Sequence, residues 1–316
     1  MAFNLNDTSA SSADKAFTSS VDNTPVNNPI VPDSQAELTT PGLSQVELND
    51  PNEIKVHIQN EKAPIVVLFG PPTCGKTMTM IRLAHFLVKN GYSVTPVKSF
   101  RPKTDTHYEH LCNDFRRMLN SDMAQVGTGK ISFMLLEVSK GGKTYCQLLE
   151  APGEHYFNPK DPKEAHPRYL HKISSAKNRK LWVYFIEPDH TSRDMENEER
   201  LNYVDKIKRF KETHTSPSDR NTIVYSKIDE TSFLLSKDTV KTSAALENAR
   251  QAYPGLIESF KNQNPITKIW KSYLCDFVPY SNGFFNSLKD GGLVFEMGSD
   301  KYPRRLWESI MKSIRG

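Results

Sequence analysis

The sequence predicts a three-layer α/β fold, with helices on both faces of a mostly parallel sheet that contains one antiparallel strand. Apolar runs of strand length alternate with helical patterns, which is typical of parallel strands joined by crossover helices. The clearest unit covers residues 65–90, where an apolar run, a glycine-rich loop and a helical pattern follow one another. Residues 131–138 and 144–149 flank a Gly-Gly turn and predict a hairpin, which supplies the antiparallel exception.

The other elements are predicted from hydrophobic periodicity. The continuous apolar run at residues 181–186 indicates a buried strand. Pro96 lacks a backbone N–H, so the strand predicted at residues 92–99 is either weakened or placed at a sheet edge. Residues 158–180 are basic and are predicted to form a loop. Further strands are predicted at 222–225 and 275–280, and helices at 106–119, 195–211, 244–252, 257–260 and 303–314.

Charge divides the chain into an acidic tail and a basic remainder. Residues 1–50 contain seven acidic residues and one lysine, whereas the whole chain of 316 residues carries a net charge of +4. This polar segment has too little apolar surface to offset the entropy lost on ordering. We therefore predict a disordered acidic tail at 1–50 and one folded domain at 51–316, which contains the glycine-rich loop. The basic charges of the domain are dispersed, so no nucleic-acid partner is expected.

The sequence also bears on the cellular setting. No apolar run approaches the length that spans a bilayer, and no basic-then-apolar leader is visible. The four cysteines are scattered without metal-ligand spacing. A reduced, cytoplasmic setting without a transmembrane segment is therefore expected.

Residues 70–77 match the G-x-x-x-x-G-K-[ST] pattern of a phosphate-binding loop. The glycines permit backbone angles and close approaches that a side chain would block. The loop amides converge at a helix N-terminus, where the helix dipole favours negative charge. Lys76 is expected to reach the β- and γ-phosphates, and the Thr77 hydroxyl to ligate Mg²⁺. The predicted nucleotide contacts of the loop come from Gly70, Thr73, Cys74, Gly75, Lys76 and Thr77.

Three shorter motifs follow the loop along the chain. Thr128 lies in a Gly-Thr-Gly segment 22 residues before Glu150, Glu150-Ala-Pro-Gly153 ends the second hairpin strand, and Ser226-Lys-Ile-Asp229 follows a later strand. With the phosphate loop, these motifs make residues 63–285 resemble the translation-factor and Ras-related class of P-loop GTPases.

The resemblance implies a magnesium site and a nucleotide-sensing switch. It assigns the metal to Thr77, Thr128 and Glu150, and it assigns the sensing of the γ-phosphate to the amide of Gly153. The threonine of the switch orders its loop when the γ-phosphate is present. Glu150 departs from the pattern, because the class has an aspartate there, one methylene shorter. This departure bears on the geometry of the Mg²⁺ site and on the rate of hydrolysis.

The resemblance also implies recognition of guanine by residues 226–229. A carboxylate at Asp229 can accept hydrogen bonds from the N1–H and the 2-amino group of guanine, and adenine offers neither arrangement. The stem of Lys227 is expected along the face of the base, and Ser226 is expected to hydrogen-bond to the phosphate loop. Ser281 lies where the class has a loop whose amide contacts the guanine oxygen.

Catalytic roles are assigned to Lys76, Glu154 and His155. In the class, the residue directly after the glycine orients the attacking water. Glu154 occupies that position, and a carboxylate that faces the γ-phosphate would be repelled. His155 is the substitute. The same Gly-Glu arrangement makes this segment similar to the bacterial double-GTPase-type domains.

These assignments predict a GTP-binding switch protein with GTP and Mg²⁺ as cofactors, slow hydrolysis, and an unidentified protein effector or activator. Two alternatives stay open. The first is a P-loop ATPase of the AAA type, for which an apolar strand ending in Asp-Glu would be expected, and no predicted strand ends so. The second is a hydrolysis-deficient nucleotide-binding scaffold, which Glu150 and Glu154 favour.

Overall fold

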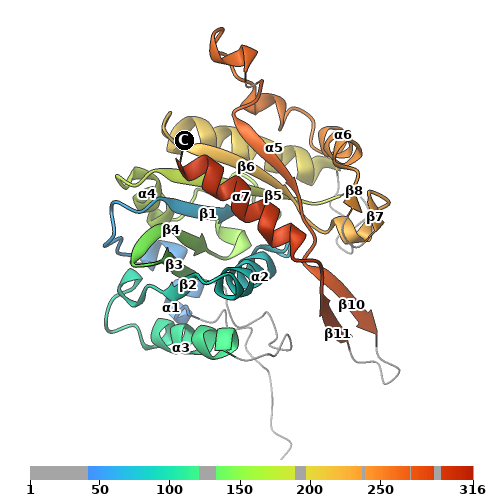
Figure 1. Cartoon of the computed structure of the whole chain (residues 1–316). Coiled ribbons are helices and arrows are strands. Elements are labelled where there is room, and N and C mark those ends of the chain that lie inside the picture. The colour runs from blue at the N-terminus through green and yellow to red at the C-terminus, as the bar shows by residue number, and fades with distance from the viewer. Residues whose placement is uncertain are drawn as a thin grey trace, which may run out of the picture. The chain divides into compact units, whose positions relative to one another are not determined.

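The computed structural model describes residues 42–120, 133–188, 197–236, 239–270, 272–287 and 293–315. Within them the chain forms a seven-stranded sheet of order β2-β3-β4-β1-β5-β6-β9 and two small hairpins (Figure 1). The strands of the sheet are β1 (Ile65–Phe69), β2 (Ser93–Pro96), β3 (Met134–Lys140), β4 (Lys143–Glu150), β5 (Lys180–Ile186), β6 (Arg220–Tyr225) and β9 (Cys275–Pro279). The hairpins pair β7 (Leu234–Ser236) with β8 (Thr239–Val240), and β10 (Gly283–Ser287) with β11 (Leu293–Met297).

The strand directions confirm the predicted sheet. β1 pairs in parallel with β4 and β5, β5 with β6, and β6 with β9. β3 runs antiparallel to both of its neighbours, β2 and β4, and β2 lies at an edge, where Pro96 is tolerated. All strands of the sheet except β3 run in the same direction. The residues that follow β1, β4, β5, β6 and β9 therefore meet at one end of the sheet.

Helices cover both faces of this sheet, as predicted (Figure 1). α2 (Lys76–Lys89) and α7 (Lys301–Arg315) contact each other on one face. α5 (Asn197–His214) lies on the other, where the ring of Phe210 is 5.0 Å from that of Phe69 in β1 and 4.7 Å from that of Trp182 in β5. The further helices are α1 (Gln45–Asn49), α3 (Thr106–Asn120), α4 (Arg168–Ser175) and α6 (Thr242–Ala252). Short 3₁₀ helices lie at Pro51–Glu53, Lys98–Phe100, Gly153–His155, Ile228–Glu230, Glu258–Phe260 and Thr267–Ile269.

The helix α4 lies inside residues 158–180, which the sequence predicts as a loop. Its side chains Tyr169, Leu170 and Ile173 are buried in the core. Two turns of helix give too few repeats for periodicity to be read from the sequence. Among the described residues, no helix combines the length and the apolar character that crossing a membrane requires.

The folded region also begins earlier than the predicted boundary at residue 51. Leu43 is buried, and the helix α1 follows it within the segment predicted as tail. Glu47 of α1 pairs with the buried guanidinium of Arg101, which also lies 2.7 Å from Asp105. This ion-pair group fastens α1 to the start of α3, an interaction between distant segments that local composition does not reveal.

Candidate functional site

The loop between β1 and α2 has the backbone of a phosphate-binding turn. Thr73 has a φ of +62° and Gly75 a φ of +92°, both in the left-handed region. This region is costly for threonine and easily reached by glycine. Gly75 directly precedes the first residue of α2, so the loop amides lead into the N-terminus of that helix. Within the loop, Cys74 is fully buried, and burial raises the pKa of its thiol.

Lys76 is held by the loop itself. Its Nζ donates to the carbonyl oxygens of Gly70 at 3.0 Å and Pro71 at 2.9 Å, and the side chain is buried. The ammonium therefore lies inside the curve of the loop. A positive charge in this place, beside amides at a helix N-terminus, favours an anionic ligand.

The side chains of Thr77 and Glu150 meet at the end of the sheet. The Thr77 hydroxyl donates to Glu150 Oε1 at 2.8 Å, because the parallel register of β1 and β4 places Leu68 opposite Glu150. Glu150 is only 2% exposed, and its Oε2 has no hydrogen-bond partner among the described residues. Burial raises the pKa of Glu150 to about 8, against the opposing effect of the Lys76 charge.

This pair has the chemistry of a divalent-cation site. A hydroxyl and a carboxylate oxygen are ligands that Mg²⁺ accepts, and the unbonded Oε2 leaves one carboxylate oxygen for it. A cation would also offset the desolvation of the buried carboxylate. The third predicted ligand, Thr128, lies outside the described residues.

Gly153 lies directly against the phosphate loop. A Cβ atom at this position would come within 2.2 Å of the Pro72 nitrogen and 2.4 Å of the Pro71 carbonyl carbon. Only glycine allows the two backbones to approach so closely. The segment that follows Glu150 is therefore in contact with the loop that carries Lys76.

The next two residues take different environments. Glu154 is exposed, whereas His155 is half-buried and its Nδ1 lies 2.9 Å from the Tyr169 hydroxyl of α4. Burial lowers the pKa of His155 to about 4, and the charge of Lys76 acts in the same direction. His155 is therefore neutral at physiological pH and a weak base. Both residues line a cavity of about 280 Å³ with Pro152 and Lys206.

The predicted base-recognition segment follows β6. Ser226 donates from both its N–H (2.9 Å) and its hydroxyl (3.2 Å) to the Ile186 carbonyl of β5, so its side chain does not bond the phosphate loop as expected. Asp229 is half-buried in the 3₁₀ turn, and the Ile228 N–H donates to the Tyr280 carbonyl at 3.3 Å. This bond ties the segment to the chain that carries Ser281.

Lys227 makes a contact that the sequence did not predict. Its Nζ lies 2.7 Å from Glu187 Oε2, and Glu187 is 1% exposed. Glu187 directly follows β5, and β5 is the neighbour of β6, so the two residues meet at adjacent strand ends. The sequence does show Glu187 directly after the apolar strand β5. It does not show that Lys227 is the partner, because that depends on the order of the strands in the sheet.

The loop at Ser281 is held by α2. Arg82 donates to the Ser281 carbonyl and to the Ser299 carbonyl, and the Thr79 hydroxyl donates to Asn282 Oδ1 at 3.3 Å. These contacts were not predicted either. Ser281 itself is buried.

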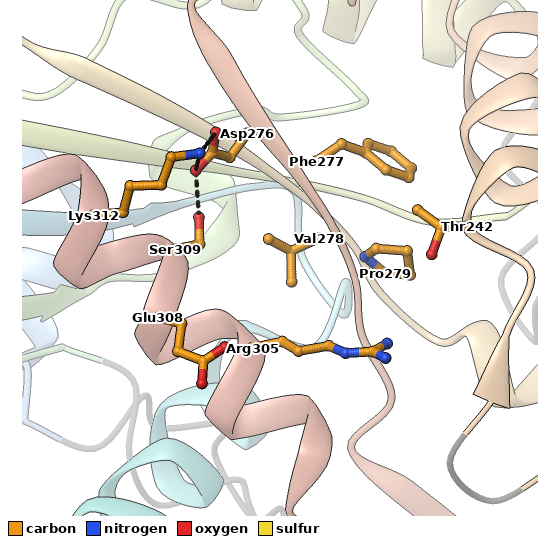
Figure 2. Close-up of a pocket in the computed structure, with 9 residues that line it drawn as sticks. All are labelled: Thr242, Asp276, Phe277, Val278, Pro279, Arg305, Glu308, Ser309 and Lys312. Atoms are coloured by element: carbon orange, nitrogen blue, oxygen red, sulfur yellow. Dashed lines mark hydrogen bonds and ion pairs between the residues drawn. The ribbon is translucent and has the colours of Figure 1, made fainter.

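The structure therefore brings the motifs to one end of the sheet. Glu150 ends β4, and the segments after β4, β6 and β9 carry the other predicted residues, beside the phosphate loop that follows β1: Gly153, Ser226, Lys227, Asp229 and Ser281. Ligands of parallel α/β sheets bind at the carboxyl ends of the strands. A separate hollow of about 420 Å³ lies on the edge strand β9, where Asp276 contacts Ser309 and Lys312 of α7 (Figure 2). None of the predicted site residues lines it.

Comparison with known proteins adds little to this geometry. No family model matches the chain. No curated protein matches it either. One similar solved structure is that of a protein described as nucleolar GTP-binding protein 1 of Plasmodium falciparum, at 10% identity and a TM-score of 0.39, over 83% of this chain and 90% of that one. A similarity of this size identifies neither ligand nor activity, so the function is argued from the site.

The contact at Gly153 yields a prediction. Gly153→Ala should lower the free energy of unfolding by about 1–3 kcal/mol, because the methyl group forces two backbones apart. It should also weaken nucleotide binding. Gly142→Ala is the matched control: its Cβ meets nothing within 4 Å, so only backbone strain of about 1 kcal/mol is expected and binding should not change. Denaturant unfolding and nucleotide titration of both variants measure this. Equal effects of the two substitutions on binding would contradict the proposed contact.

The Glu187–Lys227 ion pair yields a second prediction. Glu187→Gln should cost about 3 kcal/mol in unfolding free energy, because the substitution leaves a mostly buried ammonium without its counter-charge. Glu61→Gln removes one partner of an exposed ion pair with Lys177 and should cost less than about 1 kcal/mol. Urea denaturation of both variants decides the matter. If Glu187→Gln is as mild as Glu61→Gln, the ion pair does not stabilise the end of β6.

Proposed function

We propose that this protein binds a guanine nucleotide with Mg²⁺ and hydrolyses it slowly. The observation that carries the proposal is the 2.8 Å hydrogen bond between Thr77, in the phosphate loop, and the buried Glu150. It brings together two oxygen-bearing side chains from residues far apart in the sequence, and both are groups that Mg²⁺ accepts as ligands in a Mg²⁺–triphosphate complex.

The phosphate half of the proposed site uses the loop residues. Lys76 would place its ammonium on the β- and γ-phosphates, and the amides from Thr73 to Thr77 would donate to phosphate oxygens. Thr77 and Glu150 would hold Mg²⁺, which would neutralise part of the phosphate charge. The amide of Gly153 would donate a hydrogen bond to the γ-phosphate. The contact of Gly153 with Pro71 and Pro72 supports this role.

The base half of the proposed site uses the segments after β6 and β9. Asp229 would accept hydrogen bonds from the N1–H and 2-amino groups of guanine. Lys227 keeps a role beside the base, but its Nζ is engaged by Glu187, which fixes the direction of its stem. Ser281 would present its backbone N–H, since Arg82 already holds its carbonyl.

The residues near the γ-phosphate position support a low rate of hydrolysis. Glu154 is an exposed carboxylate, which an anionic phosphate would repel. His155 is neutral and tied to Tyr169, so it can orient water only weakly and accepts protons poorly at neutral pH. An activating partner would then supply the missing water-positioning or charge-stabilising group.

A hydrolysis-deficient scaffold is the second candidate, and Glu150 favours it. A pKa of about 8 means that the carboxylate is largely protonated at neutral pH before a cation binds, which weakens the metal site. An ATPase is less well supported. The carboxylate after β5, Glu187, lies in an ion pair with Lys227 and is not available as a base.

Competition binding and turnover separate these candidates. Displacement of a fluorescent GTP analogue by GTP but not by ATP, with measurable phosphate release, is expected for the GTPase. Displacement by ATP would favour the ATPase. Tight GTP binding without phosphate release would favour the scaffold.

Asp229 gives the sharpest test of base recognition. Asp229→Asn should lower the affinity for GTP by at least about tenfold and improve that for xanthosine triphosphate, because the amide donates to the 2-oxygen of xanthine. The same substitution at Asp276, on β9 and paired with Lys312, is the matched control and should change neither affinity. Unaltered base preference in Asp229→Asn would remove this residue from the base site.

A further inference from the structure

The most exposed large apolar side chains of the described residues gather on the loop between α6 and β9. Trp270 is 88% exposed, Ile269 80% and Ile266 73%, and these three form what we term the apolar tip. In Figure 1 the loop projects from the top of the view, in orange. Apolar groups gathered in this way mark an interaction surface more often than scattered single residues do.

The base of this loop is closed by backbone hydrogen bonds. The Leu274 N–H donates to the Phe260 carbonyl at 2.7 Å, and the Asn262 N–H donates to the Ser272 carbonyl at 2.9 Å. Phe260 is buried in the core. The loop therefore projects from the fold with its two ends held together by hydrogen bonds.

Asparagine side chains shape the tip itself. Asn262 is buried, and its Nδ2 donates to the Thr267 hydroxyl at 2.9 Å. Asn264 Oδ1 accepts from the N–H groups of Ile266 at 2.9 Å and Thr267 at 3.2 Å, which starts the 3₁₀ turn that carries the tip. Polar contacts thus hold three apolar side chains in solvent, at a cost in hydration that a binding partner would recover.

The strand after the loop is equally well fixed. In Figure 2, Asp276 of β9 lies beside Lys312 and Ser309 of α7, with Oδ1–Nζ at 3.0 Å and Oδ2–Oγ at 3.2 Å. The tip is therefore presented on a rigid support.

The segment that carries the tip has charges of one sign. Residues 259–275 contain three lysines and no aspartate or glutamate. The side chains of Lys261 and Lys268 are exposed. A partner of complementary charge is therefore negative.

We propose that the apolar tip inserts into the headgroup region of an anionic lipid bilayer. Even complete burial of these three side chains removes only about 500 Å² from water, below the ~800 Å² per partner of a stable protein interface. A bilayer needs no complementary pocket for a convex tip. Tryptophan favours the membrane interface, and each lysine near an anionic surface adds attraction.

The position of the loop is compatible with nucleotide binding. The loop precedes β9, whereas the proposed nucleotide contacts follow the strands of the parallel sheet. The tip and the nucleotide site therefore lie at opposite ends of the strands. Membrane contact through the tip does not require the nucleotide site to be covered, and the inference does not depend on the proposed function.

Vesicle binding by the full chain tests the proposal. Co-sedimentation is expected with vesicles of phosphatidylcholine and phosphatidylserine, and much less with phosphatidylcholine alone. Trp270 is the one exposed tryptophan of the three in the chain, since Trp182 and Trp307 are buried. Its fluorescence should shift to the blue on binding, and Trp270→Phe should abolish this shift while leaving most of the binding.

Variants assign the binding to the tip. The triple variant Ile266→Ser, Ile269→Ser and Trp270→Ser should lose at least about tenfold in affinity for the anionic vesicles, and Lys268→Ala about fivefold. Leu201→Ser, at an exposed leucine of α5, and Lys103→Ala are matched controls that should bind like the wild type. Thermal unfolding of every variant checks that the fold is kept.

Two outcomes would overturn the proposal. One is that the wild-type protein binds neither kind of vesicle. The other is that the triple variant binds anionic vesicles as well as Leu201→Ser does. In the first case, dimers or a complex with an acidic protein that the triple variant abolishes would make the tip a protein contact.

Discussion

The candidate site depends on one constraint, the parallel pairing of β1 with β4. This register places the end of the phosphate-loop strand opposite Glu150, and it lets the Thr77 hydroxyl donate to a carboxylate 73 residues further along the chain. A carboxylate buried this deeply is costly unless it is neutralised or paired. The raised pKa of Glu150 expresses that cost, and a cation at the proposed site would remove it.

The helix α2 joins the two halves of the proposed nucleotide site. Its first residues include Lys76 and Thr77, and further along its first two turns Thr79 and Arg82 hold the loop at Ser281 and Asn282. Movement of the phosphate loop would therefore also move the loop at Ser281, which we propose to face the base. The contact of Gly153 with Pro71 and Pro72 couples the segment after β4 to the same loop.

Local sequence patterns predicted the elements that depend on neighbouring residues. The strand, the loop and α2 form one continuous segment, and Pro96 indicated a strand that is weakened or lies at an edge, which is where β2 lies. The features of the site that the sequence did not predict depend on contacts between distant segments. Ser226 bonds to β5 rather than to the phosphate loop, and Lys227 pairs with Glu187, because β5 and β6 are neighbours in the sheet. The short helix α4, which positions His155 through Tyr169, offered too few turns for a periodic signal.

The central claim, that Thr77 and Glu150 form a cation site for a bound nucleotide, is tested most directly by the Mg²⁺ dependence of GTP affinity. Titration of wild type and Glu150→Gln, with and without Mg²⁺, provides the comparison. We expect Mg²⁺ to strengthen GTP binding to the wild type and to give Glu150→Gln little or no gain, because an amide is a much poorer ligand than a carboxylate. An equal gain in both proteins would contradict the account.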